Sequence, residues 1–152
     1  MYQEDVLETW YKTDDEIAAT FAVADILRGL REAGLSTKVF DSGLGISSFR
    51  DNSTRTRFSF ASACNLLGLG LQDLDEGKSQ IAHGETVRET ATMVSFMAAT
   101  IGIRDAMFIG KGNAYMRDVS AALVDSYPAR VLEQRPPLAY LQCDIHPPTP
   151  AI

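Results

Sequence analysis

Three hydroxyl side chains and two guanidinium groups stand in five consecutive residues, Ser53-Thr54-Arg55-Thr56-Arg57. An apolar run, 45–49, precedes them, and a run with helical spacing, 58–67, follows. The segment is therefore predicted to start a helix, where backbone N–H groups lack acceptors within the helix and the dipole favours negative charge. Hydroxyls add donors, and arginine adds a planar fork that matches phosphate oxygens. We predict an anion-binding site here, with solvated surface as the alternative.

The bulk composition predicts a soluble globular protein of one domain. The chain has 152 residues, of which 45% are hydrophobic and 22% charged, and its formal net charge is −6. That charge argues against a general nucleic-acid or membrane-surface binder, but not against a small anionic ligand, which responds to the local field. The acidic N-terminus lacks the basic start and the apolar stretch of a signal peptide, so we expect a cytoplasmic protein.

The two cysteines and two histidines do not have the spacing of a zinc site. Cys64 and Cys143 lie far apart in apolar surroundings. Both are therefore predicted to be buried, reduced thiols.

The elements around the hydroxyl and arginine segment alternate between strands and helices. A capping box at 13–16 starts a predicted helix that stops at Gly34. Further helices are predicted over 53–67, over 86–99 and from a cap at Asn113 to Ser126. Strands are predicted over 46–49, 69–74, 100–104 and 138–143, with a short edge strand over 36–40. This alternation predicts an α/β fold, a three-layer sandwich with a four-stranded parallel sheet flanked by helices.

Polar features follow several of the predicted strands. Arg55 follows the first, the polar segment 75–85 follows the second, and Arg104 ends the third. Because ligands bind beyond the carboxyl ends of parallel strands, we expect these three features to lie together.

Three segments carry a resemblance to a known family. Residues 49–60, which read Phe-x-x-x-Ser-Thr-Arg-Thr-Arg-x-Ser-Phe, resemble the carbamoyl-phosphate signature of the aspartate and ornithine carbamoyltransferases. Residues 79–85, Ser-Gln-Ile-Ala-His-Gly-Glu, are similar to the ornithine-type loop, and 99–104 to the strand that ends in an active-site arginine. The motifs occur in the family's order and spacing. The resemblance extends over nearly the whole chain, and within the family it is greatest to the YgeW-type carbamoyltransferases.

The resemblance implies roles for individual residues. Ser53, Thr54, Arg55 and Thr56 are expected to cradle the phosphate of carbamoyl phosphate, with Arg55 also binding it by side chain. Arg104 is expected to reach the phosphate and the carbonyl, so Arg55 and Arg104 are the expected catalytic residues. Arg57 belongs to the substrate-binding motif, with packing and pairing as its alternative role.

Two further residues are implied with less support from the chain itself. Gln80 is expected to complete an active site in the next subunit of a homotrimer, because the family lends this loop to a neighbour; a solvated loop residue is the alternative. The tail 146–150 reads His-Pro-Pro-Thr-Pro and lacks the glutamine of the family's His-Pro-x-Gln motif. His146 is therefore either a ligand contact or a solvated residue.

The implied reaction is transfer of a carbamoyl group from carbamoyl phosphate to the amino group of an amino acid or related amine, with release of phosphate. It implies no metal and no cofactor. Residues 1–152 are expected to form the carbamoyl-phosphate-binding domain, with the amine-binding domain absent or on a separate chain. The alternatives are a non-catalytic module that binds carbamoyl phosphate or another phosphorylated metabolite, a truncated fragment and a structural piece of a trimer. The sequence does not identify the amine.

Overall fold

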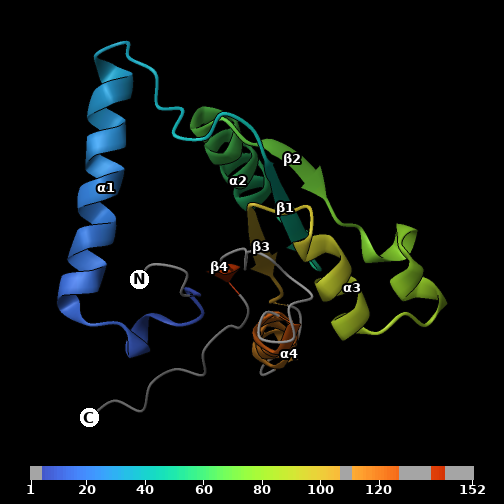
Figure 1. The fold of residues 1–152 in the computed structure, drawn as a ribbon. Coiled ribbons are helices and arrows are strands. Elements are labelled where there is room, and N and C mark those ends of the chain that lie inside the picture. The colour runs from blue at the N-terminus through green and yellow to red at the C-terminus, as the bar shows by residue number, and fades with distance from the viewer. Residues whose placement is uncertain (1–4, 107–110, 127–137, 143–152) are drawn as a thin grey trace.

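A computed structural model describes residues 5–106, 111–126 and 138–142. Figure 1 shows a β-sheet packed between helices, with one long helix, α1, standing apart. The helices are α1 (Asp14–Glu32), α2 (Thr54–Leu67), α3 (Val87–Ser95) and α4 (Lys111–Ser126). The strands are β1 (Leu44–Phe49), β2 (Gly70–Asp73), β3 (Thr100–Arg104) and β4 (Leu138–Gln142), and the short 3-10 helices are η1 (Thr9–Tyr11), η2 (Glu76–Lys78) and η3 (Gln80–His83).

The strands form a parallel sheet in the order β2-β1-β3-β4. Ile46 of β1 lies opposite Gln72 of β2 on one side and Ile101 of β3 on the other. Since parallel strands need crossover connections, the helices between them pack on the sheet. The predicted α/β fold with a parallel sheet flanked by helices is therefore confirmed.

Alternate residues of β1 pack against helices on opposite faces of the sheet. Ile46 belongs to a buried cluster with side chains of α3, β3 and α4, whereas Phe49 packs with Phe60 and Cys64 of α2. The period of two along a strand explains this division, because successive side chains point to opposite faces. Cys64 is a buried free thiol, as predicted; Cys143 lies outside the described residues.

Several predicted elements are confirmed, and three differ in their ends or type. The capping box of α1 is present, since Glu16 N–H bonds to Thr13 Oγ1 at 3.3 Å and Thr13 N–H to Glu16 Oε2 at 2.8 Å. The predicted edge strand over 36–40 is wrong: the N–H groups of Val39 and Phe40 both bond to Leu67 O at the end of α2 instead of pairing in the sheet.

The predicted cap at Asn113 is also wrong, because α4 already includes Lys111 and Asn113 lies inside the helix. Its amide oxygen accepts from Arg117 Nε at 2.7 Å, one helical turn later. The helix predicted over 86–99 ends earlier, at Ser95, and Ala99 N–H then bonds to Leu44 O at 2.7 Å, which starts the return to the sheet. Within the described residues, no helix is long and apolar enough to cross a membrane.

Gly45 lets α2 approach β1. A Cβ atom on Gly45 would lie 2.5 Å from Cys64 Sγ but 3.6 Å from Cys64 Cβ. Gly45→Ala should therefore lower the free energy of unfolding by about 1–3 kcal/mol through overpacking. Cys64→Ala removes the clashing sulfur. The double variant should therefore lose less unfolding free energy than the two single variants lose in sum.

Urea unfolding of the four proteins measures this coupling. Gly70→Ala is a suitable control, since its Cβ would meet its nearest atoms at 3.6 Å, an ordinary contact. Strict additivity of the two single effects would contradict the close approach of α2 to β1 at this position.

Candidate anion-binding site

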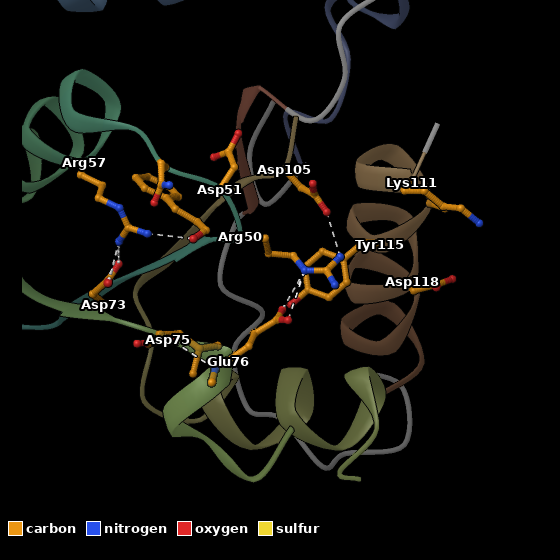
Figure 2. Close-up of a pocket in the computed structure, with 15 residues that line it drawn as sticks. Arg50, Asp51, Arg57, Asp73, Asp75, Glu76, Asp105, Lys111, Tyr115 and Asp118 are labelled. Atoms are coloured by element: carbon orange, nitrogen blue, oxygen red, sulfur yellow. Dashed lines mark hydrogen bonds and ion pairs between the residues drawn. The ribbon is translucent and has the colours of Figure 1, made fainter. Parts of the chain in front are cut away.

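The carboxyl ends of β1, β2 and β3 border one cleft of about 920 Å³. Its wall comes from the residues that follow these strands and from the first turns of α4, as Figure 2 shows. Of the three polar features predicted to lie together at this edge, the start of the segment 75–85 lines the cleft, whereas Arg55 and Arg104 do not. The charged and aromatic side chains on the wall include Arg50, Asp51, Arg57, Asp73, Asp75, Glu76, Asp105, Lys111, Tyr115 and Asp118.

The start of α2 has the geometry predicted for an anion site. Ser53 is the N-cap, and its hydroxyl oxygen accepts from Thr56 N–H at 3.3 Å. The N–H groups in the first turn of an α-helix have no acceptor within the helix. The Ser53 cap satisfies the N–H group of Thr56, so the N–H groups of Thr54 and Arg55 still have no helical acceptor. An anion at this helix start would meet those two amides and the positive end of the helix dipole.

The two motif arginines occupy different environments. Arg55 is exposed and forms no ion pair with any of the described residues. Arg57 is half-buried: its Nη1 lies 2.6 and 2.7 Å from the two carboxylate oxygens of Asp73, and its Nη2 donates to Phe49 O at 2.8 Å. Its guanidinium also lies 5.4 Å from the centre of the Phe49 ring. These contacts assign Arg57 to pairing and packing, the alternative role in the sequence analysis.

Arg57→Gln should therefore destabilise the fold more than Arg55→Gln. Arg57 ties the first turn of α2 to the ends of β1 and β2, but solvent screens its half-exposed pair with Asp73, so the expected loss is about 1–2 kcal/mol. Arg55→Gln should change the free energy of unfolding by less than about 0.5 kcal/mol. Urea denaturation measures both, and equal losses would contradict the division of roles.

Two Arg-Asp dipeptides pair reciprocally at the ends of β1 and β3. Arg50 Nη1 donates to Asp105 Oδ2 at 2.8 Å, and Arg104 forms an ion pair with Asp51. The side chains of Arg104 and Asp51 are 13% and 11% exposed, so this pair is largely shielded from water, whereas in the other pair Asp105 is 6% and Arg50 34% exposed. We call these four residues the Arg-Asp clamp.

Arg104 retains a donor for a ligand despite this pairing. Its Nε is buried and has no acceptor among the described residues. A buried donor without a partner is costly, and an acceptor placed beside it would recover that cost. Asp51 also accepts from Ala106 N–H at 3.2 Å, so it would keep one partner if Arg104 moved toward an anion.

Arg50 joins four elements through one guanidinium. Its Nε lies 3.1 and 3.2 Å from the two carboxylate oxygens of Glu76, Nη1 contacts Asp105, and the group stacks 4.4 Å from the centre of the Tyr115 ring. Figure 2 shows these side chains converging from β1, η2, β3 and α4. Arginine suits this position because its planar fork can pair in two directions while its face stacks on an aromatic ring.

Burial raises the pKa of Tyr115 to about 12, and the charge and hydrogen bond of Glu76 add to the increase. The ordinary pKa is about 10, so the folded state holds the phenolic proton more tightly than the unfolded state. The resulting stability is complete below pH 10 and is lost as the pH rises from about 10 to 12.

Tyr115→Phe keeps the ring beneath Arg50 but removes the titrating hydroxyl. The free energy of unfolding of this variant should therefore decrease less at alkaline pH than that of the wild type. The difference in unfolding free energy between pH 9 and 11.5 should shrink by roughly 2 kcal/mol, measured by urea unfolding at each pH. Tyr11→Phe, at an exposed position, is the control and should retain the wild-type slope. A Tyr115→Phe slope equal to that of the wild type would contradict this assignment.

The structure brings together only part of the predicted residue set. Arg57 lines the cleft, whereas the α2 start, Arg104 and Gln80 are not on its wall. Gln80 is exposed and is the first residue of η3. His146 lies outside the described residues.

Sequence reasoning missed the carboxylates of the cleft and Tyr115. Asp51, Glu76 and Asp105 each follow a strand closely, so the rule for the carboxyl edge of parallel sheets could have found them. Tyr115 had no such signal, because its position in α4 depends on how that helix packs.

The cleft, the helix start and the parallel sheet define the class of protein. The chain belongs to the family described as aspartate/ornithine carbamoyltransferase, carbamoyl-P binding domain, whose model matches residues 4–130. The resemblance found in the sequence is therefore confirmed.

Individual relatives agree with that family. The chain is 66% identical over 149 residues to the protein named "Putative carbamoyltransferase YgeW" of Escherichia coli (strain K12), covering 98% of this chain and 38% of that protein. It is 33% identical over 94 residues to the ornithine carbamoyltransferase of Corynebacterium diphtheriae, covering 60% of this chain and 30% of that protein. The chain thus spans well under half the length of these relatives.

Solved structures share the fold at low identity. Aspartate transcarbamoylase from Trypanosoma cruzi in complex with carbamoyl phosphate and aspartate superposes with a TM-score of 0.73 at 16% identity, over 92% of this chain and 41% of that one. Ornithine carbamoyltransferase from Pyrococcus furiosus superposes with a TM-score of 0.73 at 22% identity, over 92% and 40%. At these identities the likeness supports the fold alone.

Proposed function

We propose that this chain is the carbamoyl-phosphate-binding part of a carbamoyltransferase, which transfers the carbamoyl group of carbamoyl phosphate to the amino group of an amino acid or related amine. The observation that carries the proposal is the helix start of α2, where Arg55 is exposed and unpaired among the described residues beside two uncapped amides. Membership of the carbamoyl-P binding domain family supports carbamoyl phosphate as the anion.

Each part of the site has a role in this reaction. The hydroxyls and amides of 53–56 and the Arg55 side chain hold the phosphate, which leaves with its negative charge. Arg104 turns part of its pairing from Asp51 to the ligand and stabilises the carbonyl oxygen, which becomes negative as the amine attacks. Arg57 holds the α2 start in place through Asp73 and does not contact the ligand.

The remaining parts of the proposal concern the complete assembly. Residues 1–152 form one domain, a three-layer sandwich on a four-stranded sheet, and the amine is bound by a second domain or another chain. The assembly is a cytoplasmic homotrimer in which Gln80 reaches the site of the neighbouring subunit. His146 contributes a further contact to the carbamoyl group.

Removing the free guanidinium should weaken binding of carbamoyl phosphate at least tenfold, since one charge-assisted hydrogen bond is worth about 1.5–3 kcal/mol. Isothermal titration calorimetry of the wild type and Arg55→Ala with carbamoyl phosphate measures this loss. Arg28→Ala, which removes an exposed arginine of α1, is the matched control and should bind as the wild type does. Equal affinities of the wild type and Arg55→Ala would overturn the site.

A further inference from the structure

In the segment 75–84, which carries Gln80, one side chain, that of Glu76, forms polar contacts with other parts of the described fold. The backbone hydrogen bonds given for 75–84 are internal, such as Lys78 N–H to Asp75 O at 3.0 Å and Ala82 N–H to Ser79 O at 3.2 Å, except that the next residue, Glu85, donates its N–H to Gln80 O at 3.1 Å. The segment's other side-chain bonds and the Asp75–Lys78 ion pair are internal as well. Among the side-chain bonds of this segment, those of Glu76 to Arg50 and Tyr115 reach another part of the described fold.

The partner of Glu76 is held rigidly. Arg50 directly follows β1, and its N–H donates to Arg104 O at 2.9 Å, which extends the pairing of β1 with β3. Its Nη1 is bound by the buried carboxylate of Asp105, and its face rests on the Tyr115 ring. With these contacts fixed, the Nε group points at Glu76 from a preorganised position.

We propose that Arg50 is a positioning residue that holds the segment 75–84 against the carboxyl edge of the sheet through Glu76. The role of Gln80 in a neighbouring subunit rests on the proposed function, whereas the tether itself does not. Arg50 then differs from Arg55 in kind: Arg55 offers its donors to a ligand, while Nε and Nη1 of Arg50 are occupied by carboxylates.

The tether has a direct physical consequence. A segment with few contacts to the core opens locally at a small cost in free energy, and a single partly buried ion pair supplies much of that cost here. Losing the pair should raise the population of molecules in which 75–84 is locally open, while the strands and α2 keep their structure. Delivery of Gln80 would then become less favourable, because a more mobile segment loses more entropy on docking.

Amide hydrogen exchange of the full chain, followed by mass spectrometry, tests the tether without any ligand. Glu76→Ala should speed exchange in 76–84 about tenfold and leave β1, β3 and α2 unchanged. Glu76→Gln should lie between it and the wild type, because the amide oxygen still accepts from Arg50 Nε. Lys78→Ala, which breaks only the internal pair with Asp75, is the control and should stay within about twofold of the wild type.

Two comparisons decide the outcome. The double variant Arg50→Gln/Glu76→Ala should show amide exchange in 76–84 no faster than the faster of the two single variants. The reason is that both substitutions remove the same contact, the pair between Arg50 and Glu76. Wild-type exchange in Glu76→Ala, or acceleration in Lys78→Ala equal to that in Glu76→Ala, would overturn the proposal. Calorimetry with carbamoyl phosphate separates it from the proposed function: a wild type that binds no carbamoyl phosphate removes that function and leaves the exchange result unaffected.

Discussion

The Arg-Asp clamp is the interaction on which the site depends. Parallel pairing brings the ends of β1 and β3 side by side, and each end carries an arginine followed by an aspartate. Reciprocal pairing neutralises four charges that would otherwise crowd one edge, and burial strengthens each pair. It also gives the two arginines different neighbours, since Arg104 pairs with Asp51, close in sequence to the α2 start, and Arg50 pairs with Glu76 as well as Asp105.

In the proposed function, the carboxylates around the site would restrict which anions bind. A ligand with a single carboxylate would offer Arg104 the same kind of ion pair that Asp51 already forms with it. In the proposed function, the phosphate group of carbamoyl phosphate offers several oxygens, for the amides at 54–55, the Arg55 side chain and Arg104 together. Under that proposal, the clamp favours a multidentate anion over a simple carboxylate, although the chain as a whole is acidic.

The sequence was most informative where structure is local. The capping box at 13–16 and strand β3 were predicted correctly, because capping residues and short apolar runs carry their own signals. The partners of Arg50 and Arg57 could not be predicted, since they depend on strand register: β1 places Ser47 opposite Asp73 and Phe49 opposite Arg104. The cap predicted at Asn113 is wrong for a different reason, because α4 already includes Lys111 and the Asn113 side chain bonds to Arg117 within the helix.

Helical geometry explains why two motif arginines two positions apart have different environments. Residues i and i+2 point about 200° apart around a helix, so Arg55 and Arg57 cannot both face one ligand. Arg57 faces the sheet, where Asp73 and the Phe49 carbonyl bind it, and this leaves Arg55 on the exposed side of the first turn. One arginine fixes the helix start against the strand ends, and that fixed start is what gives the other arginine and the free amides a defined geometry around an anion.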